Sequence, residues 1–405
     1  MNKKLRIGIL KETKIPPDRR VPFSPGQLRD MKDHFPRAGI CIQPGSIRCF
    51  ADHEYSDHGI DLTEDLTDCD ILLGIKEILP DTLIHGKTYL FFSHSGKMQP
   101  HNRKLLQEIG KRKITLIDYE YLTDHNNNRL VAFGKWAGIV GAYNGLRAYG
   151  ERNRLFLLKP AYQCFDIKEM KNELHKVVLP AIKILVTGGG RVTGGAMEIL
   201  RSLNIQEVKP EEFLGKDFNE PVMCRIDPWH YVRRKDKSEF SMNHFIAQPD
   251  QYESVFKPFT KVTDLFMACH YWDPVSPVFM KPTDMREPDF RIKVIADISC
   301  DVNGPIPSTI RASSIENPFY GYYPLTESET PPFDPASITV MAVDNLPGEL
   351  PRDASEYFGE LLMKHIIPLL FEGDPDGIIE RATIMRQGIL TQRFKYLQDY
   401  LEGNV

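Results

Sequence analysis

The stretch from Lys183 to Pro210, "KILVTGGGRVTGGAMEILRSLNIQEVKP", decides the fold class. It begins with the apolar run ILV, which is typical of a buried strand, and continues through three glycines into a helical pattern. A strand, a glycine-rich turn and a helix in this order place the pyrophosphate of a dinucleotide on backbone amides at a helix N-terminus. The stretch therefore predicts a Rossmann-like α/β unit that binds a nucleotide.

The glycine turn departs from the pattern G-x-G-x-x-G. Counting from Gly188 and Gly190 puts Thr193 where the third glycine is expected, and Gly194 and Gly195 follow it as residues that can relieve helix packing. A glycine loop without a ligand is the alternative reading of such a turn. The residues predicted to contact the cofactor here are Gly188, Gly189, Gly190, Arg191 and Val192.

A cation stands where an acidic residue is usual. About 20 residues after the first glycine, NAD-binding proteins present Asp or Glu to the adenosine ribose. This chain has Lys209 there, which suits an additional 2′-phosphate, so NADP is the predicted cofactor and NAD the alternative. Glu211 and Glu212 lie close to Lys209 and speak against this interpretation. The basic run from His230 to Asp236 is a second candidate for the phosphate, or simply a solvated face.

Composition excludes several classes of function. The chain has 405 residues, 41% hydrophobic and 26% charged, with a net charge of -4. That charge provides no basic field for nucleic acid or an acidic membrane surface. No apolar run approaches the roughly 18 residues that a membrane helix needs, and the N-terminus lacks a signal sequence, so a cytoplasmic protein is predicted. Seven cysteines without a C-x-x-C pair indicate reduced thiols and no metal site.

Short β-rich runs alternate with helical runs along the whole chain. This alternation predicts an α/β fold of two Rossmann-like domains with parallel sheets and a cleft between them. We expect a discontinuous first domain, 1–134 plus 346–405, and a nucleotide-binding domain, 135–345. A long helix is predicted at "KWAGIVGAYNGLRAYGERN", a last strand of the first half at "RLVAFG", and a helical C-terminal tail that has no strand of its own and packs on the first domain.

Titratable residues end three predicted strands of the first domain. "ILLGIK" ends in Lys76, "TYLFFSH" in His94 and "ITLIDYE" in Glu120. Ligands of open α/β sheets bind beyond the carboxyl ends of the strands. A lysine and a histidine there suit imine chemistry, which moves protons in both directions, and Arg20 or Arg129 suits a substrate carboxylate. The alternative is that each residue marks the point where a strand meets water.

Nine stretches in order carry a resemblance to a known family. They are "KETKIPPDRRVPFSP", "ILLGIKE", "KTYLFFSHSGKMQ", "LIDYEYLTDHNNNRLVAFGKWAGIVG", "VTGGGRVTGGA", "VKPEEF", "YWDPVSP", "VIADISCDVNGPI" and "AVDNLPGELPRDASEYFG". The chain resembles the alanine dehydrogenase and saccharopine dehydrogenase superfamily. Within it, the chain is most similar to the lysine-ketoglutarate reductase half of the aminoadipic semialdehyde synthases.

The resemblance implies a reaction and a set of site residues. L-Lysine and 2-oxoglutarate would condense to an imine, which NAD(P)H reduces to saccharopine. By similarity, Lys76 and His94 form the acid-base pair and Arg20 binds a substrate carboxylate. The residues that match the lining of the same pocket are Glu77, Glu120, Arg129 and Phe133. Those that match the nicotinamide end are Asp297 or Asp301, and Asn345 and Leu346 in "AVDNLP".

Two other functions stay open at this point. One is an alanine dehydrogenase-like enzyme acting on a small oxoacid, or a transhydrogenase alpha-like protein with a partner chain. The other is a non-catalytic NADP-binding protein, against which the joint presence of Lys76, His94 and Arg20 speaks. The sequence leaves the exact amino acid and oxoacid, the physiological direction and the oligomeric state open.

Overall fold

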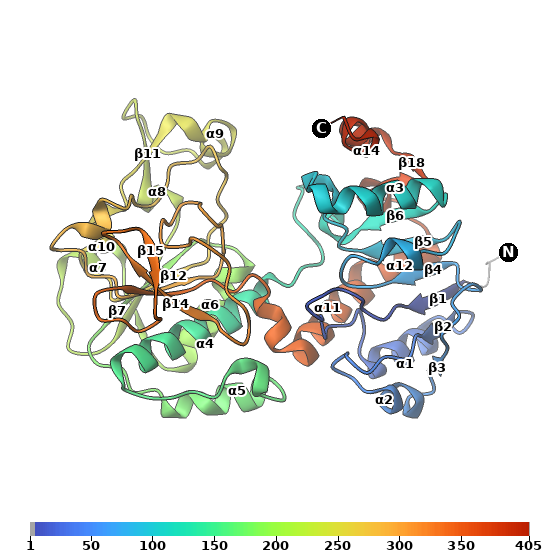
Figure 1. Ribbon diagram of the computed structural model, residues 1–405, viewed down its shortest axis with the longest axis horizontal. Helices are drawn as coiled ribbons and strands as arrows, with labels where there is room; N and C mark the ends of the chain where they lie inside the picture. Colours follow the sequence, from blue (N-terminus) through green and yellow to red (C-terminus); the bar gives the residue numbers. More distant parts are fainter. Residues whose placement is uncertain (1–4, 405) are drawn as a thin grey trace. The chain divides into compact units, whose positions relative to one another are not determined.

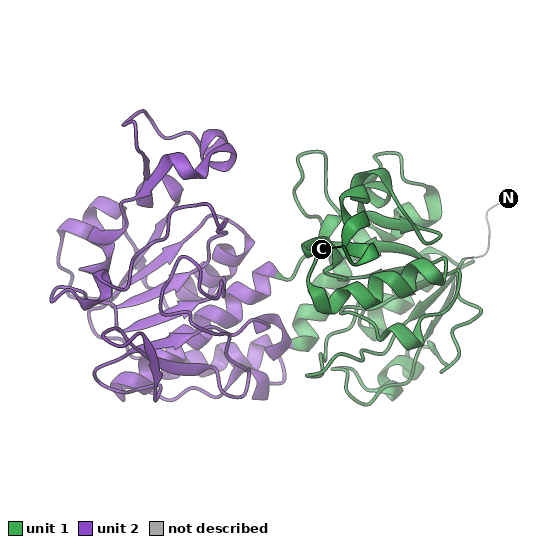
Figure 2. Cartoon of the chain, turned by 45° about the horizontal axis from the view of Figure 1, so that its top comes forward, with its two compact units in different colours: residues 1–133, 351–405 green, residues 134–350 purple. Residues whose placement is uncertain are grey.

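The computed structural model describes residues 5–404. By its internal contacts the chain divides into two compact units, residues 1–133 with 351–405 and residues 134–350 (Figure 2). Each unit is built around its own eight-stranded sheet. No helix in the described part of the chain is long and apolar enough to cross a membrane.

The sheet of the first unit has the strand order β18-β17-β6-β5-β4-β1-β2-β3 (Figure 1). Its first six strands in sequence pair in parallel. They are β1 (Arg6–Ile9), β2 (Gly39–Ile42), β3 (Asp61–Leu62), β4 (Ile71–Leu73), β5 (Thr88–Phe91) and β6 (Thr115–Asp118). The connecting helices are α1 (Pro25–His34), α2 (Asp52–Asp57) and α3 (Arg103–Lys111). The parallel order places the carboxyl ends of β1, β4, β5 and β6 side by side.

The C-terminal tail completes this unit with helices and with strands. Its elements are α11 (Pro351–His365), α12 (Ile367–Glu372), α13 (Ile378–Ala382), β17 (Thr383–Arg386), β18 (Ile389–Leu390) and α14 (Gln398–Glu402). Phe358, Leu362 and Ile366 of the tail are buried in one cluster with Ile7 and Ile9 of β1. The discontinuous first domain is thus confirmed. The expectation that the tail has no strand was wrong, because β17 and β18 extend the sheet at β6 in antiparallel fashion.

The same pairing explains a second error. "RLVAFG" forms no strand; Arg129 makes a single bridge to Thr123 and the chain then bends. The edge of β6 that this segment would need is occupied by β17. Val131 is instead buried in the core of the unit, and Phe133 packs against the same core.

The sheet of the second unit has the order β15-β14-β16-β13-β12-β7-β9-β8. The parallel strands are β7 (Lys183–Thr187), β8 (Gln206–Glu207), β9 (Val222–Ile226), β12 (Leu265–Ala268), β13 (Val294–Asp297) and β16 (Ile338–Met341). The hairpin β14 (Phe319–Tyr323) and β15 (Ser328–Thr330) adds an antiparallel edge. After β7 the chain builds β8 and β9 on one side and then crosses to β12 on the other. The point between β7 and β12 is therefore the switch point at which open α/β sheets bind ligands.

Two helices of this unit approach each other through glycines. They are α4 (Gly134–Asn153), which forms as expected, and α6 (Arg191–Ser202). A Cβ atom on Gly138 would lie 1.8 Å from the carbonyl oxygen of Val192, and one on Gly195 would lie 2.0 Å from that of Lys135. Gly195 thus relieves helix packing as predicted. Gly194 does not, because a Cβ there would meet nothing within 4 Å.

The long polar stretch 211–261 contains β9 and several short elements. These are α7 (Pro210–Gly215), α8 (Pro228–Tyr231), β10 (Val232–Arg234), α9 (Met242–Ala247), β11 (Tyr252–Ser254) and α10 (Lys257–Thr260). β10 and β11 pair in antiparallel fashion as a separate two-stranded sheet. The stretch is therefore an inserted structure and not a simple crossover.

Candidate functional site

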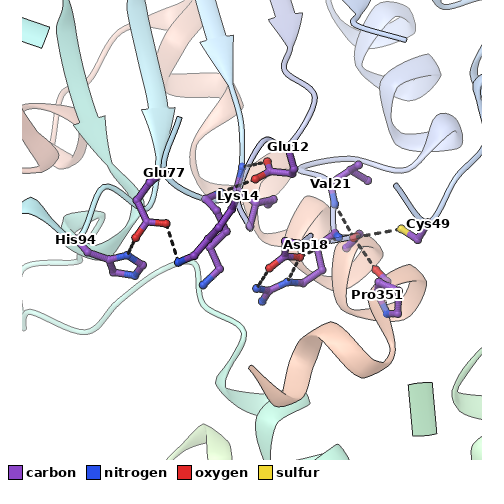
Figure 3. Close-up of polar contacts among 12 residues, drawn as sticks. Glu12, Lys14, Asp18, Val21, Cys49, Glu77, His94 and Pro351 are labelled. Carbon is purple, nitrogen blue, oxygen red and sulfur yellow. Dashed lines mark hydrogen bonds and ion pairs between the residues drawn. The ribbon is translucent and has the colours of Figure 1, made fainter. Parts of the chain in front are cut away.

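Charged side chains gather where β1, β4, β5 and β6 of the first unit end (Figure 3). Glu77 lies between the side chains of His94 and Lys14, which come from different loops. Its Oε1 is 2.5 Å from Nδ1 of His94, and its Oε2 accepts a hydrogen bond of 3.0 Å from Nζ of Lys14. Burial by itself would raise the pKa of Glu77, but the hydrogen bond and charge of His94 outweigh it and lower the pKa to about 2. Glu77 is therefore a permanent anion that orients the His94 ring.

Asp118 at the end of β6 fixes the turn that carries His94. Its Oδ2 accepts hydrogen bonds from the backbone N–H and the hydroxyl of Ser93, at 2.9 and 2.6 Å. Its Oδ1 accepts from the backbone N–H of Glu120 at 2.8 Å. His94 itself has a left-handed backbone with φ of 50°, a conformation that non-glycine residues adopt mainly where their surroundings enforce it. One buried carboxylate thus positions two candidate residues on neighbouring strands.

Lys76 lies beside this group without an ion-pair partner. Among residues 5–404 its ammonium group has no hydrogen-bond acceptor, although the lysine is half-buried. Burial, and after it the positive charge of Arg20, lowers the pKa of Lys76 to about 8. A lysine of this kind exists partly as the neutral amine at physiological pH, so it can accept a proton.

Glu12 determines the path of the chain at Lys76. Its carboxylate accepts the backbone N–H groups of Ile75 and Lys76, at 2.6 and 3.0 Å. Burial raises the pKa of Glu12 to about 7, against these hydrogen bonds. The loop after β1 therefore supports the loop after β4 through one side chain, a role that no sequence pattern indicates.

Arg20 is already bound to a carboxylate of the chain. Its Nε and Nη2 donate to Oδ1 and Oδ2 of Asp18 at 3.0 and 2.6 Å, and both side chains are buried. Burial alone would raise the pKa of Asp18, but Arg20 outweighs it and holds that pKa below its usual range. The guanidinium also lies 4.3 Å from the centroid of the Phe133 ring, which stacks on Phe358. Arg20 thus contributes a buried, oriented positive charge next to Lys76.

Glu120 and Arg129 form a separate ion pair at the rim. Arg129 Nη2 lies 2.5 Å from Glu120 Oε1, and Lys97 Nζ is 4.0 Å from the same oxygen. Arg129 is about half exposed and Glu120 is mostly buried. Of the residues predicted for this site, the structure pairs Glu77 with His94 and Glu120 with Arg129. Lys76 precedes Glu77 in the loop after β4. The structure adds Glu12, Lys14 and Asp18, which sequence patterns did not indicate because they act through the shape of the loop after β1, and Asp118 at the end of β6.

The glycine turn of the second unit has the form that a pyrophosphate requires. Gly188 has φ of 96°, and a Cβ there would lie 2.8 Å from the carbonyl oxygen of Cys269 at the switch point. Gly190 faces open space, and α6 begins at Arg191 and continues through Val192. His270, buried after β12, accepts or donates at Nδ1 to the Thr187 hydroxyl over 3.0 Å, and burial lowers its pKa to about 3. The residues present fit a dinucleotide held by backbone amides.

Lys209, the residue predicted for the 2′-phosphate, lies apart from the cavity beside the glycine turn, and its contact with a cofactor stays a prediction. Lys209 is an exposed residue that precedes α7, and it is not among the residues lining the cavity of about 290 Å³ beside Gly189 and Gly190. The strand next to β7 is β9 and not β8, so Arg225 and Asp227 occupy that place. A Cβ on Gly189 would lie 2.7 Å from Asp227 Oδ1 and 3.2 Å from Arg225 Nη1.

The residues predicted for the nicotinamide end have mixed environments. Asp297 ends β13 and is buried; it accepts from the Thr309 hydroxyl at 2.6 Å and from the Cys300 N–H at 3.0 Å. Burial raises its pKa to about 6. Leu346 is buried, whereas Asp301 and Asn345 are half-buried. Contact of any of them with a cofactor stays a prediction. No group of three or more potential metal ligands occurs in the part of the chain that is described.

Known proteins resemble this chain over most of its length. It is 29% identical to an alpha-aminoadipic semialdehyde synthase of Arabidopsis thaliana, covering 98% of this chain and 42% of that protein. The mouse protein of the same name, which is mitochondrial, is 28% identical over 95% of this chain and 47% of its own length. The chain thus spans less than half of these two relatives. A saccharopine dehydrogenase [NAD(+), L-lysine-forming] of Emericella nidulans is 27% identical over 90% of this chain and 92% of its own length.

Solved structures show the same fold. An L-alanine dehydrogenase superposes with a TM-score of 0.65 at 15% identity, covering 99% of this chain and 100% of that chain. A transhydrogenase from Sinorhizobium meliloti gives 0.62 at 13% identity, covering 95% and 100%. These two structures confirm the predicted α/β fold. The relatives named above confirm the predicted resemblance. Residues 8–140 match the family described as alanine dehydrogenase/PNT, N-terminal domain.

Proposed function

We propose that this protein is an NAD(P)-dependent oxidoreductase acting on a CH–NH group, which reduces the imine of L-lysine and 2-oxoglutarate to saccharopine. The observation that carries the proposal is the unpaired Lys76, with its pKa lowered to about 8, beside the Glu77–His94 pair at one edge of a sheet. The names of the relatives support the choice of substrates, which the geometry alone does not select.

The chemistry needs two proton-handling groups. An amine attacks a ketone only in its neutral form, and the resulting carbinolamine loses water only when its oxygen is protonated. Lys76 in its neutral form accepts a proton from the substrate ammonium group. His94 holds Nδ1 toward Glu77, which leaves Nε2 as the ring atom that exchanges a proton with the substrate. In this assignment Lys76 removes a proton from the substrate amine, and His94 protonates the carbinolamine oxygen.

The substrates are rich in carboxylates, and the site is rich in cations. Arg129 at the rim is exposed enough to bind a carboxylate, in exchange with Glu120. Arg20, held by Asp18, favours anions near Lys76 through its charge. In the second unit Gly188, Gly189 and Gly190 would hold the pyrophosphate of NADP(H). When bound, that cofactor supplies a hydride to the imine carbon.

A substrate panel tests the proposal. NADPH and NADH oxidation is followed spectrophotometrically with L-lysine plus 2-oxoglutarate and, in parallel, with pyruvate plus ammonia. We expect the fastest rate with NADPH, L-lysine and 2-oxoglutarate. A faster reaction with pyruvate and ammonia would show an alanine dehydrogenase-like enzyme instead. No oxidation with either pair, by a folded protein, would contradict an enzymatic role with these substrates.

A further inference from the structure

The cavity beside the glycine turn of the second unit has two arginines in its wall. It has a volume of about 290 Å³ and is lined on one side by Gly189, Gly190 and the start of α6. Its other side is formed by Arg201, Glu207 and Arg225. These residues come from α6, β8 and β9, so three elements converge on one small space. The cavity lies where a dinucleotide on this turn would place its adenosine ribose.

The ion pair between Arg225 and Asp227 at the end of β9 places the Arg225 guanidinium at the cavity. Arg225 Nη2 is 3.0 Å from Asp227 Oδ2, and Nη1 is 3.3 Å from Oδ1. The Asp227 side chain is only 8% exposed and lies against Gly189, whereas the Arg225 side chain is 38% exposed and lines the cavity. A guanidinium that binds a carboxylate through one edge keeps N–H donors on its other edges. Arg225 therefore offers donors to the cavity, and Asp227 orients it.

A second arginine faces the same space. Arg201 Nη2 lies 2.9 Å from Glu207 Oε2, and its side chain is 60% exposed. The wall thus holds two guanidinium groups, each with one carboxylate as counter-ion. A phosphate monoester carries up to two negative charges and binds the planar fork of arginine through two oxygens. It would compete with Glu207 for Arg201, because a dianion attracts the cation more strongly than a single exposed carboxylate does.

We infer that this cavity binds the 2′-phosphate of NADP(H), with Arg225 as its main ligand and Arg201 as the second, and that Lys209 takes no part. The inference rests on the proposed use of a dinucleotide and adds the residues that bind its 2′-phosphate. Asp227 acts as a positioning residue for Arg225.

The test uses two fragments of the cofactor and the full chain without substrates. Calorimetry measures the binding of adenosine 2′,5′-bisphosphate and of adenosine 5′-monophosphate. We expect the wild-type protein to prefer the bisphosphate by about tenfold or more. Arg225→Gln should remove most of this preference while its affinity for the monophosphate changes by less than about twofold. Lys209→Gln, the matched control outside the cavity, should keep the preference.

Each other outcome overturns the inference. Equal binding of the two nucleotides by the wild-type protein would show that no 2′-phosphate site exists, while leaving the dinucleotide function intact. Loss of the preference in Lys209→Gln but not in Arg225→Gln would move the phosphate to Lys209. Binding of neither nucleotide would remove the dinucleotide site and the proposed function with it. Should Arg225→Gln fail to fold, Arg201→Gln at the exposed second ligand carries the test, and an undiminished preference there would contradict its role.

Discussion

Lys76 is the residue whose chemistry depends most on its surroundings. A lysine with an ordinary pKa would be almost fully charged at pH 7, and burial together with Arg20 lowers the pKa of this one to about 8. Burial disfavours the ammonium form and Arg20 repels it, so both effects act in the same direction. The lowered pKa therefore follows from the burial of Lys76 and from Arg20 in the loop after β1, which together outweigh the opposite effect of Asp18.

Replacement of Lys76 by methionine tests this role. Because the neutral amine is the active form, wild-type kcat/KM should rise with pH and level off near pH 8. In Lys76→Met we expect kcat/KM to fall by roughly 100-fold or more, and the ionisation near pH 8 to disappear from the profile. Lys104→Met, at an exposed lysine on α3, is the control and should retain both rate and profile. An unchanged profile in Lys76→Met would remove the assignment.

Sequence patterns located the site residues that end strands and missed those that lie in loops. Lys76 and His94 directly follow apolar runs, so parallel pairing alone brings their loops together. Lys14 and Asp18 are within reach of this group only because of the particular shape of the loop after β1, which periodicity does not encode. The order of the second sheet is a further case: β8 follows β7 along the chain, but β9 lies beside β7 in the sheet, and local patterns do not encode this order.

At the level of elements, the contact between α4 and α6 depends on glycines with different roles. A Cβ on Gly138 would overlap the Val192 carbonyl, and backbone there cannot move without separating the helices. Gly138→Ala should therefore lower the free energy of unfolding by at least about 2 kcal/mol. Gly194→Ala is the matched control on the facing helix, and it should be neutral or stabilising by up to about 1 kcal/mol, since alanine favours helix. Urea denaturation without nucleotide measures both.

Equal stability of the two variants would contradict the packing described for α4 and α6. The helices themselves were predictable, because the run that became α4 and the turn before α6 have strong local patterns. The hairpin β14–β15 and the strands β17 and β18 were not. They are short, and their pairing with distant strands decides their structure more than their own composition does.

At the level of the whole molecule, the chain leaves its first unit after Phe133 and returns to it at Pro351. The return supplies core residues such as Phe358 and Leu362 and two edge strands. The helices of this C-terminal segment were predictable, because its apolar residues recur with helical spacing and need a domain to pack on. The strands were not, since β17 pairs with β6, which lies more than 250 residues earlier, as Thr383 opposite Ile117 shows, and β18 pairs only with β17.

One measurement tests the proposed reaction most directly. The protein is incubated with L-lysine, 2-oxoglutarate and NADPH carrying deuterium at the transferred position, and the product is examined by mass spectrometry. Condensation of the ε-amine with the ketone releases water, and hydride transfer to the imine carbon then gives saccharopine. We predict saccharopine with one deuterium on the carbon that was the ketone of 2-oxoglutarate. Unlabelled saccharopine, or its absence while labelled alanine forms from pyruvate and ammonia, would contradict the proposal.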